Sequence, residues 1–302
     1  MGIRRGLVLG CGGTVGGAWT VGALAVVAAE LSWDPREADL LIGTSTGSSL
    51  VTLLGGGVGV DELVAAQRDE PAARPVVRTF FTQPPPTWPS RPSFRVTAPR
   101  LALRRAGVLP TLAGLIPRGR ATATFLDGIA TEFATAEGWV PHPATWLVAV
   151  ELGSGQRVAF GRADAPRATL RQALHASWGM PGYYKPMELE GRRYADGGIA
   201  STASIDFAAA AGLDEVVLIA PMASRGKERI GGIGGKVEGV MRAPMSATLD
   251  REVAELEAAG TRVLRIHPST DDLAVMGPNF MDPRRRLPAL QAALGSVRAQ
   301  LV

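Results

Sequence analysis

The chain has 302 residues, of which 46% are hydrophobic and 20% are charged, and its formal net charge is +4. These proportions exclude an intrinsically disordered chain and predict a globular protein with a substantial core. The single cysteine, Cys11, excludes an intrachain disulfide and fits a reducing compartment, and the three histidines are too scattered for a zinc site. We therefore expect neither a metal nor another cofactor.

An uncharged run over residues 6–29 follows Arg4 and Arg5 near the start of the chain. Its length suits a signal peptide or a membrane span, but seven glycines crowd its first two thirds. We prefer a buried strand at 6–9, a glycine-rich turn and a helix at 18–31, with export as the weaker alternative. The turn lacks the glycine spacing of a dinucleotide site, but its backbone N–H groups can face a tetrahedral oxyanion.

The next stretch, residues 40–50, predicts a strand that turns sharply into a helix with Ser45 at the apex. Two residues on either side of the apex, such a turn leaves no room for a Cβ atom, which suits Gly43 and Gly47. The apex hydroxyl lies at the amino end of the helix, where negative charge is favoured, so a serine nucleophile is expected there. The predicted nucleophile elbow comprises Gly43, Thr44, Thr46 and Gly47.

Residues 71–125 differ in composition from the rest of the chain, which is net negative. They contain nine arginines, ten prolines and no acidic residue. This predicts an irregular excursion, either a solvated loop or a cap that touches an anionic membrane, and a basic amphipathic patch at 101–109 suits the cap. No recognised binding module accompanies the arginines, so we expect no nucleic-acid partner. We expect a cytoplasmic protein that lies at the membrane periphery if the cap docks.

The second half of the chain alternates predicted strands with helices and turns. One strand ends at Asp196, and Gly197 and Gly198 follow it in a tight turn that can present the carboxylate at the edge of a sheet. A glycine-rich run at 226–239 lacks the spacing of a phosphate loop and predicts a mobile surface loop. Further strands are predicted at 145–152, 157–160, 215–220 and 262–266, and helices at 168–177 and 287–301.

Alternating short apolar strands and helices predict a three-layer α/β/α sandwich with a mostly parallel central sheet. We predict a single α/β domain over residues 1–302. Its core lies at about 6–210, the excursion at 71–125 is a candidate cap, and residues 211–302 complete the domain. In such sheets ligand sites lie at the carboxyl ends of strands, which is where we expect the candidate serine and aspartate.

Three motifs occur in a defined order: the glycine-rich turn at 10–17, the Ser45 turn at 43–47, and the acid turn at 196–198. Together they resemble the patatin-like phospholipase family, and the resemblance covers roughly residues 6–210. The first motif departs from the family pattern, because Thr14 stands in place of the third glycine and Gly16 in place of a basic residue. The resemblance extends to residues 17–24 and 176–183.

The resemblance implies a lipid acyl hydrolase in which Ser45 is the nucleophile and Asp196 is the base, without an intervening histidine. A serine hydroxyl needs such a base within hydrogen-bond reach to attack an ester. The implied product of the attack is an acyl-enzyme, and the implied substrate is a lipid or another acyl ester. The implied oxyanion hole uses backbone N–H groups of Gly12, Gly13 and Thr14, and the implied acid turn includes Gly197 and Gly198.

Two alternatives stay open from the sequence. A Ser–His–Asp triad is the mechanistic rival, with His267 in the right chain order and His175 less well placed. A catalytically weak or inactive membrane-associated binding protein that retains the fold is the functional rival, and the substitutions at Thr14 and Gly16 favour it. Either way the ester class and the oligomeric state stay open, and a fluorophosphonate probe that reacts with an activated serine would separate the alternatives.

Overall fold

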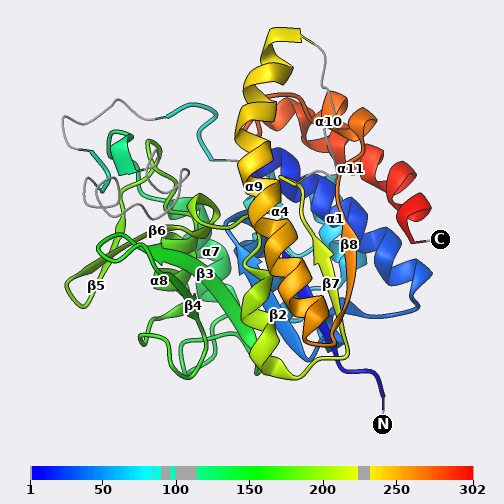
Figure 1. Ribbon diagram of the computed structural model, residues 1–302, viewed down its shortest axis with the longest axis horizontal. Coiled ribbons are helices and arrows are strands. Elements are labelled where there is room, and N and C mark those ends of the chain that lie inside the picture. The colour runs from blue at the N-terminus through cyan, green and yellow to red at the C-terminus, as the bar shows by residue number, and fades with distance from the viewer. Residues whose placement is uncertain (1, 84, 90–95, 99–113, 224–231, 302) are drawn as a thin grey trace.

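The computed structural model describes residues 2–83, 85–89, 96–98, 114–223 and 232–301. Within these ranges an eight-stranded sheet lies between two layers of helices (Figure 1). The strand order is β5-β6-β3-β2-β1-β7-β8, and β4 pairs with β3. The strands are β1 (Arg5–Leu9), β2 (Leu40–Thr44), β3 (Thr145–Glu151), β4 (Arg157–Phe160), β5 (Met187–Leu189), β6 (Arg192–Asp196), β7 (Glu215–Ile219) and β8 (Arg262–Ile266).

The sheet has a parallel part and an antiparallel part. Strands β3, β2, β1, β7 and β8 are parallel to their neighbours in that series, whereas β4, β6 and β5 add antiparallel pairs at one end. All residues of β2 and β7 are buried, as expected of parallel strands covered on both faces. The predicted α/β architecture with a mostly parallel sheet is therefore confirmed.

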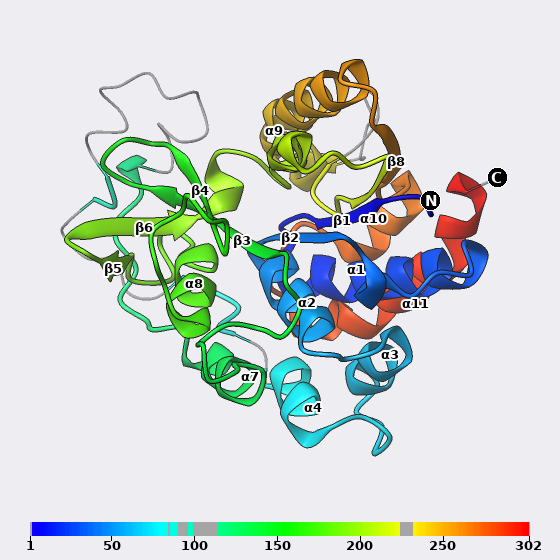
Figure 2. The ribbon, with the colours of Figure 1, turned by 90° about the horizontal axis from the view of Figure 1, so that it is seen from below.

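Helices cover both faces of the sheet. Figure 2 shows α9 on one side of β1 and β2, and α1, α2 and α11 on the other. Leu7 and Leu9 of β1 point into the larger core beneath α1, whereas Val8 points into the core beneath α9. The helices are α1 (Gly13–Glu30), α2 (Thr46–Gly55), α3 (Val60–Gln67), α4 (Pro75–Thr82), α7 (Asp127–Glu132), α8 (Leu170–Ser177), α9 (Gly232–Ala258), α10 (Thr270–Met276) and α11 (Arg286–Ser296).

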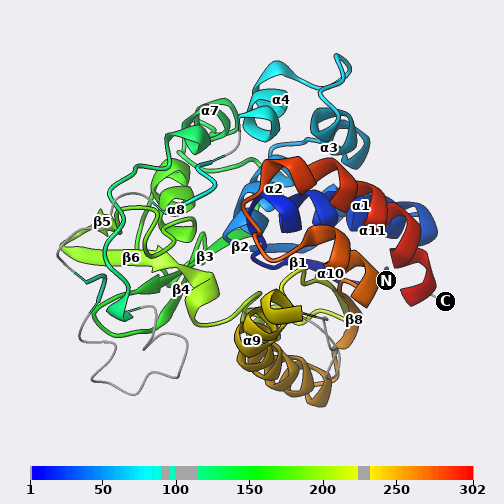
Figure 3. The ribbon, with the colours of Figure 1, turned by 90° about the horizontal axis from the view of Figure 1, so that it is seen from above.

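Helix α1 is the stretch whose sequence also suited a membrane span. It is long and apolar enough to cross a membrane by length and composition, but 72% of it is buried inside the protein. Figure 3 shows α1 alongside α11, and the apolar side chains of α1 belong to the larger core. The core helix of a globular protein has the same length and composition.

Two predictions about irregular segments were wrong. The glycine-rich run at 226–239 was predicted as a loop, but from residue 232 onward it forms the first turns of α9. Within the predicted irregular excursion, α4 forms a helix that begins at Pro75 and buries Val77, Phe80 and Phe81. Proline at the first helical position and apolar residues three and four apart explain this helix. The predicted patch at 101–109 lies outside the described residues.

Candidate active site

The strands that carry the candidate serine and aspartate end opposite each other along one edge of β3. Thr44 ends β2 opposite Val148, and Asp196 ends β6 opposite the next residue of β3. The carbonyl oxygen of Ala144 accepts a hydrogen bond from β2, and the N–H of Leu152 donates one to β6. Backbone groups of residues an even number apart along a strand point to the same edge, so β2 and β6 both lie along one edge of β3. Because β2 is parallel to β3 and β6 is antiparallel to it, the two strands run toward each other and their ends meet.

Ser45 follows β2 at a sharp turn into α2. Its backbone has φ 56° and ψ −121°, a conformation that costs on the order of 1–3 kcal/mol for a residue with a Cβ atom. The turn is tight enough that a Cβ atom on Gly43 would lie 2.4 Å from the Gly47 carbonyl oxygen. A Cβ atom on Gly47 would lie 2.1 Å from the carbonyl oxygen of Leu9 in the neighbouring strand. Glycine at both positions therefore lets this turn form against β1.

Ser177, the last residue of α8, bridges the gap between β2 and β6. Its hydroxyl donates a hydrogen bond to the carbonyl oxygen of Val148 (2.7 Å) and accepts one from the backbone N–H of Ser45 (2.9 Å). These bonds satisfy two buried backbone groups at the point where the sheet is interrupted. Ser177 thereby fixes the backbone of the strained turn. This role could not be predicted from the sequence, because it depends on two contacts more than 25 residues away along the chain.

Asp196 is 5% exposed and lies with Ser45, which is 6% exposed, in the space where the two strands meet. The backbone N–H of Gly198 donates to the Asp196 carboxylate at 2.8 Å. Burial raises the pKa of Asp196 from 3.8 to about 6, and hydrogen bonds from the Ser45 side chain and from Gly198 offset part of that rise. The structure therefore brings the predicted serine and aspartate into direct contact.

The glycine-rich turn lies beside the same site, because a Cβ atom on Gly17 would be 2.6 Å from the Thr46 hydroxyl. Gly12 caps α1, and Gly13 has φ 59°. Among the described residues, no acceptor bonds to the N–H groups of Gly12, Gly13 or Thr14, whereas the N–H of Val15 donates to Phe280. Free N–H groups and the positive end of the helix dipole favour a negative charge at this position.

The acid turn and the segment that follows it hold the glycine-rich turn in place. The N–H of Cys11 donates to the carbonyl oxygen of Thr202 at 2.8 Å, and a Cβ atom on Gly198 would lie 3.0 Å from the Cys11 sulfur. A Cβ atom on Gly197 would approach the Val148 carbonyl oxygen within 2.8 Å. Cys11 is buried in this contact, and its position there is that of a small packing residue.

A pocket opens beside the candidate serine. Phe80 and Phe81 of α4 form one part of its wall, and Phe125 and Trp178 stand edge to face at 5.0 Å in another. Residues from the predicted excursion thus help to line the pocket. The full lining is Thr14, Gly17, Thr46, Gln67, Phe80, Phe81, Pro85, Phe125, Trp178 and Arg286.

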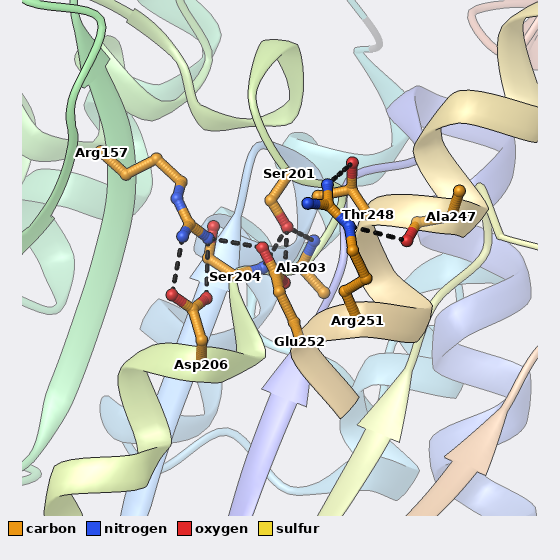
Figure 4. A network of polar contacts seen from close by, with 9 residues as sticks. All are labelled: Arg157, Ser201, Ala203, Ser204, Asp206, Ala247, Thr248, Arg251 and Glu252. Carbon is orange, nitrogen blue, oxygen red and sulfur yellow. Dashed lines mark hydrogen bonds and ion pairs between the residues drawn. The ribbon is translucent and has the colours of Figure 1, made fainter. Parts of the chain in front are cut away.

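A polar network supports the loop that follows the acid turn (Figure 4). Arg157 of β4 makes two hydrogen bonds of 2.7 Å to Asp206 and one of 2.8 Å to Glu252 of α9. The Ser201 hydroxyl donates to Glu252 at 2.8 Å and accepts from the N–H of Ser204 at 2.9 Å. The network ties the segment after Asp196 to α9 and to β4 of the same sheet.

The histidines have other contacts. His175 Nε2 lies 2.7 Å from Asp127, and the backbone of His267 pairs with the side chain of Gln300. The groups that shift the pKa of Asp196 are Ser45 and Gly198, and no histidine is among them. In the part of the chain that the structure describes, no group of three His, Cys, Asp or Glu side chains could hold a metal ion.

Comparison with known proteins agrees with this fold. The family model for patatin-like phospholipases matches residues 7–209. The chain therefore belongs to the patatin-like phospholipase family, whose members are typically lipid acyl hydrolases, and the predicted family is confirmed. One similar solved structure is VipD from Legionella pneumophila, with 14% sequence identity and a TM-score of 0.47 over 99% of this chain and 67% of that chain. No curated protein sequence matches the chain.

Proposed function

We propose that this protein is a serine acyl hydrolase that cleaves carboxylic ester bonds of lipids through Ser45 and Asp196. One observation carries the proposal. A serine at a strained strand–helix turn hydrogen-bonds to a buried carboxylate whose pKa is raised to about 6. A strained backbone and a perturbed pKa at one place are typical of a catalytic site.

In the proposed reaction, Asp196 takes the proton of the Ser45 hydroxyl as its oxygen attacks the ester carbonyl carbon. The negative charge that develops on the carbonyl oxygen faces the N–H groups of Gly12, Gly13 and Thr14, each of which contributes roughly 3 kcal/mol where such donors have been measured. When the tetrahedral intermediate collapses, the alcohol leaves with the proton held by Asp196. An acyl group remains on Ser45.

The second half of the reaction reverses the roles. Asp196 takes a proton from water, and the hydroxide oxygen attacks the acyl carbon. Ser45 leaves as the alcohol and recovers its proton from Asp196, and a carboxylic acid is released. A carboxylate with its reference pKa of about 3.9 is a weak base for these steps, so the raised pKa of Asp196 increases its basicity.

A fluorophosphonate probe tests the proposal directly. The probe reacts with serines that a neighbouring base and an oxyanion site activate, so we expect one adduct per chain, located on Ser45 by peptide mass spectrometry. Ser45→Ala should abolish the adduct, whereas Ser154→Ala, which removes a partly exposed hydroxyl in the β3–β4 hairpin, should retain it. Absence of labelling in the folded wild-type protein, or an adduct on another residue, would instead favour the binding protein without catalysis.

Peripheral contact with an anionic membrane is a further part of the proposal. Trp88, Leu115 and Ile116 are 72%, 52% and 41% exposed, and a Cβ atom on Gly182 would lie between Ile116 and Pro89. Exposed apolar side chains of this kind favour interfacial contact. Two of the nine arginines are not available for lipid, because Arg74 and Arg78 form ion pairs with Glu62 and Asp69.

Co-sedimentation with liposomes tests this contact. Binding should increase with the fraction of anionic lipid and decrease as salt is added. Trp88→Ala should weaken binding several-fold because it removes the most exposed large apolar side chain among the residues that the structure describes, whereas Leu287→Ala on α11 should not. Equal binding to neutral and anionic vesicles, or binding to neither, would leave these residues without a membrane role.

A further inference from the structure

Arg286, the first residue of α11, places a positive charge in the wall of the pocket beside the candidate serine. Its Nη1 atom donates to the backbone carbonyl oxygen of Gln67 and, at 2.7 Å, to the side-chain oxygen of the same residue. Both acceptors are neutral. Within the described ranges no partner bonds to the Nε and Nη2 atoms of Arg286, and no carboxylate forms an ion pair with it.

This lack of a carboxylate sets Arg286 apart from neighbouring arginines. Arg74, just before α4, and Arg78 of α4 lie at 2.8 and 2.9 Å from the carboxylates of Glu62 and Asp69. Burial lowers the pKa of Arg286, and Asp69, the acidic residue that opposes this shift, already pairs with Arg78. A partly buried cation without a carboxylate is unfavourable unless another group compensates its charge.

The lining of the pocket also contains a second group that needs a partner. The Thr14 hydroxyl is buried and has no hydrogen-bond partner among the residues that the structure describes. Thr14 lies in the first turn of α1, where the backbone N–H groups also point outward without acceptors. The pocket thus presents hydrogen-bond donors and a cation among its aromatic side chains. The side-chain oxygen of Gln67, which also lines the pocket, already accepts a hydrogen bond from Arg286.

We propose that this pocket is the subsite for an anionic group of the ester substrate, a phosphate or a carboxylate. Arg286 binds the anionic group, and the Thr14 hydroxyl donates a second hydrogen bond to it. The inference rests on the proposed hydrolase function and specifies that the preferred ester substrate is negatively charged. Arg286 lies outside the matched residues 7–209. Its charge stands beside the glycine-rich turn, in which Gly16 occupies the place of the family's basic residue.

Matched ester pairs test the subsite and show which part of the substrate carries the charge. In one arm, 1-hexanoylglycerol 3-phosphate is compared with 1-hexanoylglycerol, which places the anion in the headgroup. In the other arm, the 4-nitrophenyl monoester of succinic acid is compared with 4-nitrophenyl butyrate, which places the anion on the acyl chain. In at least one arm, Arg286→Gln should lower kcat/KM for the anionic ester about tenfold, or ~1.4 kcal/mol, and leave the neutral ester within about twofold.

Further variants separate an electrostatic role from a structural one. Arg286→Lys keeps the charge but not the planar guanidinium, so it should retain part of the preference for the anionic ester. Arg298→Gln removes the same charge from an arginine whose side chain is 70% exposed, and it should change neither ester. An equal loss on the anionic and neutral esters in both arms would assign Arg286 to holding Gln67, and no loss on any ester would also overturn the subsite.

Binding of inorganic phosphate keeps the inference testable if no ester is cleaved. Calorimetric titration of the Ser45→Ala protein with phosphate, at constant ionic strength, should show binding that Arg286→Gln weakens about tenfold. Absence of hydrolysis together with this binding would reject the hydrolase and keep the anion site. Hydrolysis without charge preference and without phosphate binding would reject the anion site and keep the hydrolase.

Discussion

Replacing Ser45 with alanine is expected to lower kcat/KM for an acyl ester by roughly 10⁴-fold, and Asp196→Asn by a similar factor, because nucleophile and base act as a unit. The double variant should then be little worse than either single variant. Steady-state hydrolysis of a short-chain ester measures all three. Asparagine preserves the size of the Asp196 side chain and its hydrogen bond from Gly198, so the folded structure should be retained.

The pH dependence adds a signature that a folding defect would not produce. Asp196 must be deprotonated to accept the Ser45 proton, and its pKa is about 6. Wild-type kcat/KM should therefore be constant above about pH 7 and decrease roughly tenfold per pH unit below 6. His267→Ala and His175→Ala should leave this profile unchanged. If His267→Ala removed activity while Asp196→Asn retained most of it, a triad would replace the Ser45–Asp196 pair.

The site was predictable from sequence to the extent that its chemistry is local. A tight turn from a strand into a helix needs glycine two residues before and after the apex. A short strand that ends in Asp-Gly-Gly can likewise be recognised from neighbouring residues alone. Because the three turns occur in a defined order along the chain, they could be recognised together as the pattern of one family. What the sequence did not show is how the ends of β2 and β6 meet, because that depends on the register of both strands against β3.

Residues that act across long chain separations could not be found in this way. Arg286 contacts Gln67 across 219 positions, and Ser177 reaches Ser45 across 132. Helix α9 was missed for a different reason. Its first turns contain several glycines, which have low helix propensity, and tertiary contacts further along the helix outweigh that preference.

The largest effect on stability is expected from Arg157→Met. The side chains of Arg157 and Glu252 are 23% and 8% exposed, and the guanidinium compensates the charges of Asp206 and Glu252. Removing the shared cation leaves two carboxylates close together, so the free energy of unfolding should decrease by about 3–5 kcal/mol at pH 8. The loss should be smaller at pH 5, where protonation can neutralise a carboxylate. Urea denaturation at the two pH values measures both effects.

Glu252→Gln tests the same network with the opposite sign. Burial raises the pKa of Glu252 from 4.5 to about 7, so between these values the folded protein holds a proton that the unfolded chain has released. Wild-type stability should therefore decrease as pH increases from 4.5 to 7, by roughly 1–3 kcal/mol. Glutamine carries no titrating proton, so this variant should lose that part of the slope and gain stability relative to wild type at pH 8. Glu255 is exposed on α9, so Glu255→Gln should show the same dependence of stability on pH as the wild type. If Glu252→Gln also showed the wild-type dependence, Glu252 would titrate as an ordinary exposed glutamate.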